Sequence, residues 1–102
     1  MYQLTASYAH PDDPDAFLEH YRTRHAPLAR DFPAVRSYTW KICETPDGSK
    51  PAHFVIAFVT WDTKEDALAA LSSPAGEAAV ADLANFATAG VDIELGELTS
   101  EV

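Results

Sequence analysis

The segment 53–61, His-Phe-Val-Ile-Ala-Phe-Val-Thr-Trp, constrains the fold of this chain more than any other. It is almost continuously apolar and rich in β-branched and aromatic residues, which is typical of a strand buried on both faces of its sheet. Helices of the same chain can cover one face. The other face then needs a second non-aqueous neighbour, and a second copy of the same sheet is the simplest one.

Three further segments have strand character. Residues 2–9 alternate between apolar and polar side chains, and residues 35–43 are β-branched and aromatic and lead into a Pro-Asp-Gly turn. Residues 90–98 alternate again, which predicts an edge strand with one wet face. With 53–61, these segments predict four strands.

The first helical region is predicted between the first two strands. It has an apolar stripe at helical spacing, formed by Phe17, Tyr21, His25, Leu28 and Phe32. Asp13 is placed to cap its start, and Pro33 ends it. Pro27 removes a backbone donor inside the run, so we expect the helix to bend or loosen just after His25.

The second helical region lies between the third and fourth strands. Asp62 followed by Glu65 has the spacing of a capping box, and Ser73-Pro74 restarts the helix through about Asn85. The element order is therefore βαββαβ, which predicts an α+β, ferredoxin-like plait with a four-stranded antiparallel sheet and helices on one face. We expect one domain over residues 1–102, and two facing sheets would form a dimeric α/β barrel whose interior can hold a ligand.

Charge and cysteine content narrow the partners. Sixteen acidic and seven basic residues give a net charge of −9, which argues against nucleic acid and anionic membranes as partners. The basic residues look scattered, without a cluster. Cys43 is the only cysteine, so no disulfide forms within the chain, and neither an export signal nor a long apolar run is evident. We expect a cytoplasmic protein without a membrane partner.

His25 is the leading candidate for chemistry. It lies on the apolar stripe of the first helical region, directly before a segment that Pro27 disturbs. A partly buried histidine there can act as a general acid or base, or bind the polar end of a ligand. It can equally tie down the end of the helix through a hydrogen bond. The sequence leaves both interpretations open.

Other polar candidates have plainer interpretations. His53 fits a half-exposed packing residue at the start of a strand, and Asp82 fits a hydrogen-bonded anchor near a helix end. His10 and His20 fall in or beside exposed segments. The five-residue gap between His20 and His25 turns them to different faces of an α-helix, so we expect no metal site.

Two motifs resemble those of the EthD family, the ethyl tert-butyl ether degradation proteins. The first runs from Phe17-Leu18-Glu19-His20-Tyr21 through His25-Ala26-Pro27-Leu28 to Phe32-Pro33, and the second is Ser72-Ser73-Pro74-Ala75-Gly76-Glu77 followed by Asp82-Leu83-Ala84-Asn85-Phe86. The resemblance spans nearly the whole chain. It implies a dimeric α/β barrel linked to the degradation of small organic compounds, in a superfamily that includes cofactor-independent monooxygenases, lactone isomerases and polyketide cyclases.

The expected function follows from the resemblance together with the apolar sheet. We expect a homodimer that binds or transforms a small, largely apolar molecule in a cavity between helix and sheet, as an oxidoreductase-like enzyme without a tightly held cofactor. His25 is the expected catalytic residue. The expected substrate-binding residues are Tyr21, Trp40, His53, Phe58, Asp82 and Phe86. Alternatives are a non-catalytic carrier, an isomerase or cyclase, and, on the thin basis of a lone histidine, a haem protein.

Overall fold

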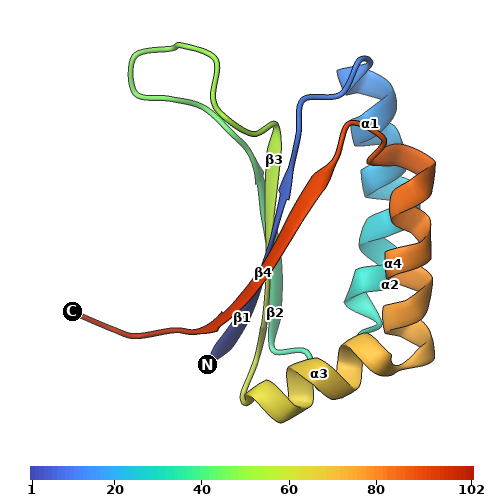
Figure 1. Cartoon of the computed structure of the whole chain (residues 1–102), viewed down its shortest axis with the longest axis vertical. Coiled ribbons are helices and arrows are strands. Elements are labelled where there is room, and N and C mark those ends of the chain that lie inside the picture. The colour runs from blue at the N-terminus through green and yellow to red at the C-terminus, as the bar shows by residue number, and fades with distance from the viewer.

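A computed structural model describes all of residues 1–102. The helices lie together on one side of the sheet (Figure 1), as a ferredoxin-like plait requires, so the predicted fold class is confirmed. The order of elements is β1 (Tyr2–Tyr8), α1 (Pro14–His20), the π-helical turn η1 (Tyr21–His25), α2 (Ala26–Arg30), β2 (Ser37–Ile42), β3 (Val55–Trp61), α3 (Lys64–Ser72), α4 (Pro74–Phe86) and β4 (Val91–Glu97). No helix is both long and apolar enough to span a membrane.

The sheet has the strand order β2-β3-β1-β4, with every neighbouring pair antiparallel. In this register Leu4 of β1 lies opposite both Val59 of β3 and Leu95 of β4. All four strands are shorter than predicted, by the greatest margin at the starts of β2 and β3, which begin at Ser37 and Val55. The two central strands are β1 and β3, and the edges are β2 and β4.

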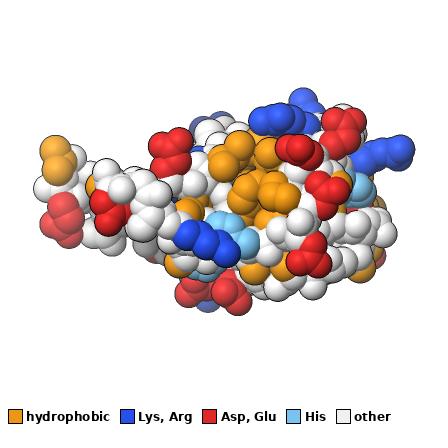
Figure 2. All heavy atoms as spheres, turned by 90° about the horizontal axis from the view of Figure 1, so that it is seen from above, with side chains coloured by type: hydrophobic (Ala, Val, Ile, Leu, Met, Phe, Trp, Pro, Cys, Tyr) orange, Lys and Arg blue, Asp and Glu red, His pale blue; other side chains and the backbone are white.

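The main core lies between the sheet and the helices. Alternate side chains of β3 point to opposite faces, and Val55, Ala57 and Trp61 point to the helices and are buried. The other face carries Ile56 and Phe58, which are only half-buried in the single chain. In the single chain, β3 is therefore fully covered on one face only. Hydrophobic side chains also reach the surface at one end of the molecule, among acidic and basic ones (Figure 2).

The helix starts follow local capping chemistry. Asp13 caps α1, because its Oδ1 accepts a hydrogen bond from the Ala16 N–H at 3.1 Å, as predicted. The predicted capping box at Asp62 is wrong. Thr63 caps α3 instead and accepts from the Asp66 N–H at 3.1 Å, while Asp62 pairs with Arg36 on the surface. The extended backbone of Thr63 fits the cap position one residue later than the sequence pattern indicated.

The first helical region contains one π-helical turn, η1. The Ala26 N–H donates to the carbonyl of Tyr21, five residues earlier. Loosening was expected just after His25, and it lies one turn earlier, over Tyr21–His25. In a regular α-helix, positions five apart are turned by about 140° from each other. A π-helical turn rotates the chain less per residue, so positions five apart come closer to one face, and His20 and His25 both reach Asp82.

Candidate functional site

Asp82 of α4 is the buried centre of a hydrogen-bond cluster. Its carboxylate accepts from His25 Nδ1 at 3.0 Å and from His20 Nε2 at 2.9 Å. A third donor is the Asn85 amide, at 3.0 Å. An acid this close to the C-terminal end of a helix is disfavoured by the helix dipole, and three donors offset that cost.

The same donors set the charge of Asp82. Burial by itself raises the pKa of this carboxyl, but the hydrogen bonds from Asn85, His20 and His25 outweigh burial and lower the pKa below its usual range. Asp82 is therefore ionised at neutral pH. An ionised carboxylate only accepts hydrogen bonds, so the ring nitrogens of His20 and His25 that face it both carry protons.

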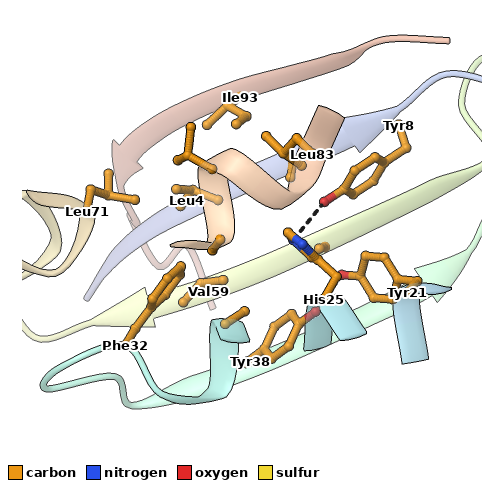
Figure 3. A pocket seen from close by; sticks show the side chains of 15 residues that line it. Leu4, Tyr8, Tyr21, His25, Phe32, Tyr38, Val59, Leu71, Leu83 and Ile93 are labelled. Carbon is orange, nitrogen blue, oxygen red and sulfur yellow. Dashed lines mark hydrogen bonds between the residues drawn. The ribbon is translucent and has the colours of Figure 1, made fainter. Parts of the chain in front are cut away.

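His25 is held in one tautomer by this contact. Its side chain is buried, and Nδ1–H donates to Asp82, which leaves Nε2 of the neutral ring as an acceptor. The Tyr8 hydroxyl donates to Nε2 through a long hydrogen bond of 3.4 Å (Figure 3). Burial lowers the pKa of His25, although the hydrogen bond and charge of Asp82 oppose the shift. The ring is thus neutral at pH 7 and presents a basic nitrogen.

That nitrogen borders an apolar cavity between the sheet and the helices. Fifteen residues line it, and His25 is the only one that is not hydrophobic. Figure 3 shows the His25 ring among side chains from the strands and from the helices. The space open to the centres of water molecules is about 50 Å³, so the cavity accepts only a small ligand unless side chains move. Two of the lining residues, Val80 and Ile93, are exposed.

Three tyrosines supply the other polar atoms of the cavity wall. The Tyr38 hydroxyl donates to the Tyr21 hydroxyl at 2.6 Å, and Tyr8 lies beside them. Burial raises the pKa of Tyr8, of Tyr21 and of Tyr38. All three hydroxyls remain protonated at neutral pH, and the single protons of Tyr38 and Tyr8 are donated to Tyr21 and to His25.

The Phe86 ring packs against the rings of both His20 and His25. Its ring centroid is 4.7 Å from that of His25 and 5.0 Å from that of His20, with which it stacks at 18°. Neither Phe86 nor Asp82 lines the cavity. These two residues, expected to bind substrate, contact the side chains of His20 and His25, and Phe86 also lines a polar surface cleft with His20.

The remaining expected substrate-binding residues separate in space. Tyr21 lines the cavity together with His25. Trp40 packs 4.9 Å from Tyr21 but lines a surface cleft rather than the cavity. Phe58 points to the opposite face of the sheet, where the Lys41 ammonium lies 5.7 Å from its ring. His53 precedes β3 and does not line the cavity. The structure therefore does not bring Phe58 and His53 to His25.

His20 is the site residue that sequence reasoning missed. It was expected to be turned away from His25, and the expectation is wrong because η1 brings residues five apart closer to one face. The sequence features that could have indicated this arrangement are Pro27, which disturbs the helix, and the five-residue spacing of the two histidines. The two histidines donate to one carboxylate, and no group of three or more His, Cys, Asp or Glu side chains is arranged to hold a metal ion. His20 also lines a polar surface cleft with Asn85.

The fold and the site define a class of protein: a ferredoxin-like α+β protein with a histidine–aspartate pair beside an apolar cavity. The EthD domain model matches residues 9–90, and the chain belongs to this family. It is 42% identical over 91 residues to an uncharacterised 11.0 kDa protein from the thcB–thcC intergenic region of Rhodococcus erythropolis, covering 89% of this chain and 88% of that protein.

Solved structures agree with this assignment. An EthD family protein from Bacillus halodurans is 30% identical, with a TM-score of 0.90 over 97% of this chain and 99% of that one. SnoaB from Streptomyces nogalater, a cofactor-independent oxygenase, is 15% identical, with a TM-score of 0.67 over 99% of this chain and 94% of that one. The likeness to SnoaB shows a shared fold alone. The predicted family is confirmed.

Proposed function

We propose that this protein binds a small, largely apolar organic molecule in the cavity and that His25 removes a proton from it. The observation that carries the proposal is the hydrogen bond from His25 Nδ1 to Asp82, which leaves a basic Nε2 at the edge of an apolar space. An aspartate in this position fixes the tautomer of the histidine and stabilises the imidazolium that forms when the histidine accepts a proton.

The proposed step is a simple proton transfer. A C–H or O–H bond of the ligand breaks, its proton goes to His25 Nε2, and the electron pair stays on the ligand as an enolate or phenolate. A ligand that contacts Nε2 displaces the long hydrogen bond from Tyr8. The Tyr8 hydroxyl is then free to donate to the developing oxyanion, and its raised pKa keeps it a donor.

Such an anion is the common first intermediate of several reactions. Reaction with dioxygen gives an oxygenase, return of the proton to another atom gives an isomerase, and attack within the ligand gives a cyclase. The cofactor-independent oxygenase of the same fold supports the first course. We therefore propose an oxidoreductase-like enzyme that needs no tightly held cofactor for its proton-transfer step.

The test uses 2-indanone, a small flat ketone with acidic protons beside its carbonyl. In D₂O the wild-type protein is expected to accelerate exchange of those protons, measured by NMR. His25→Gln is expected to lower the exchange rate by about two orders of magnitude or more, the range for loss of a general base. Ketone binding, followed by saturation-transfer NMR, should persist. Full exchange activity in His25→Gln would refute the role of His25.

A non-catalytic carrier is the second candidate. The observation that favours it is the lining of the cavity, where fourteen of fifteen residues are hydrophobic. A carrier would bind 2-indanone and return it unexchanged in both proteins. The same experiment thus separates catalysis from carriage.

We also propose that the protein is a homodimer formed through the open face of the sheet. Phe58 and Ile56 are half-buried there, on the face that no helix of the chain covers. A second copy would remove them from water. Native mass spectrometry should report twice the mass of one chain, and Phe58→Gln should reduce the dimer fraction. A wild-type protein that stays monomeric at micromolar concentration would contradict this proposal.

A further inference from the structure

The basic residues gather in one segment of the chain, in contrast to the expectation that they are scattered. Residues 22–41 hold five of the seven basic side chains and a single acid, Asp31, which gives +4. The rest of the chain has two basic and fifteen acidic residues, which gives −13. The segment comprises most of η1, all of α2 and nearly all of β2, so a local positive field faces one edge of an acidic protein.

A surface cleft lies within this basic region. It is lined by Arg22, Ala26, Arg30, Tyr38 and Trp40, and it is separate from the cavity beside His25. The guanidinium carbon of Arg22 lies 5.4 Å from the centroid of the Trp40 ring. No acidic residue lines the cleft. The space open to the centres of water molecules is about 280 Å³, several times that of the cavity.

Both arginines are free to bind an anion. Neither takes part in any of the four ion pairs of the structure, although the chain has sixteen acids. The only hydrogen bond from Arg30 runs over 3.4 Å to a carbonyl of its own helix. A guanidinium group presents a planar fork of N–H donors that matches a carboxylate, and the indole of Trp40 offers a flat surface beside it.

We propose that Arg22, Arg30 and Trp40 form a binding site for a small planar anion, an aromatic or conjugated carboxylate. The two guanidinium groups hold the carboxylate, and the unsaturated body of the ligand stacks on the indole. The small side chain of Ala26 between the arginines leaves room for the ligand. Tyr38 stands between this cleft and the cavity and lines both. This site does not depend on the proposed role of His25.

The test is a titration with sodium benzoate, followed by NMR of the two tryptophan indole N–H groups at constant ionic strength. Benzoate is expected to shift the signal of Trp40 in a saturable way and to leave that of the buried Trp61 nearly unchanged. Arg22→Gln and Arg30→Gln should each weaken binding by about tenfold, as expected for loss of one charged hydrogen-bonding partner. Benzamide, which has the same shape without the charge, should bind at least tenfold more weakly.

Two control variants make the test specific. Arg24 lies in η1 as Arg22 does but does not line the cleft, so Arg24→Gln should keep the affinity for benzoate within about twofold. His25→Gln should also leave it unchanged, which separates this proposal from the proposed function. An equal loss in Arg24→Gln would overturn the proposal, because general attraction to a positive field would then explain binding. Binding of benzamide as tight as that of benzoate would also overturn the proposal. So would an Arg22→Gln variant that keeps its affinity for benzoate but no longer self-associates.

Discussion

His25 Nδ1 lies 3.0 Å from Asp82 Oδ2, and the two residues are 57 positions apart in the sequence. One comes from the π-helical turn η1 and the other from the last turns of α4. Their hydrogen bond joins the two helical regions and determines which nitrogen of His25 faces the cavity.

Replacing Asp82 with asparagine should change both the tautomer of His25 and the stability of the protein. The neutral amide cannot accept from His25, His20 and Asn85 as the carboxylate does, so we expect a loss of about 2 kcal/mol in the free energy of unfolding. Nitrogen-15 chemical shifts should show that His25 no longer carries its proton only on Nδ1. Asp92→Asn, on the exposed edge strand β4, is the matched control and should change neither quantity.

Replacing His20 with alanine should destabilise the protein more than replacing His53 with alanine. His20 donates to Asp82 at 2.9 Å, whereas the structure shows no hydrogen bond from the His53 side chain. We expect His20→Ala to cost about 1 kcal/mol in the free energy of unfolding. Urea denaturation of both variants measures the difference. Equal stabilities would mean that the contact between His20 and Asp82 contributes nothing.

The stability of the folded state should fall as the pH is lowered through the range in which His25 becomes protonated. Burial lowers the pKa of His25 in the folded state below that of the unfolded chain, so the unfolded state binds more protons at mildly acidic pH. The stabilisation is complete above about pH 6.5, the usual histidine value, and is lost as the pH falls through the lower folded pKa. Urea denaturation from pH 8 to pH 5 should show this slope, and His25→Gln should reduce it.

Gly76 should tolerate no larger residue. It lies in the first turn of α4, directly after the corner with α3, and an added Cβ there would sit 2.3 Å from the carbonyl oxygen of Ala70. Because that atom belongs to the backbone, relief requires moving a helix, and we expect Gly76→Ala to cost about 2 kcal/mol or more. Gly96 on β4 has open space around it, so Gly96→Ala is the control. Thermal unfolding of both variants, with a lower midpoint only for Gly76→Ala, would agree with this account.

Local patterns in the sequence predict most of the fold correctly. The alternation in residues 2–9 and 90–98 reflects strands with one face toward the helices, and the capping of α1 by Asp13 is a contact between residues three apart. Both depend on interactions with near neighbours, which a sequence displays directly. The Asp62 capping box failed because two adjacent polar residues, Asp62 and Thr63, both fit the pattern. Only the backbone path out of β3 selects between them.

The sequence predicts some residues of the site but not the contacts between them. His25 and Asp82 both stand out in the sequence as candidates, yet nothing in their spacing places one against the other. In the sequence, Phe58 and Trp40 are both aromatic residues of predicted strands, although in the structure they lie on opposite faces of the sheet. Which face a strand residue occupies depends on where the helices pack, because the alternation fixes the two sets of side chains but not which set is covered.

The sequence by itself determined that this chain has four strands, two helical regions and an apolar layer between them, because these follow from hydrophobic periods of two and about four residues. The tertiary structure decided that His20 joins His25 on Asp82. That outcome depends on a single π-helical turn and on the packing of η1 against α4. The α-helical period places His20 and His25 on different faces of the helix, whereas the extra residue in the π-helical turn brings both within hydrogen-bond distance of Asp82.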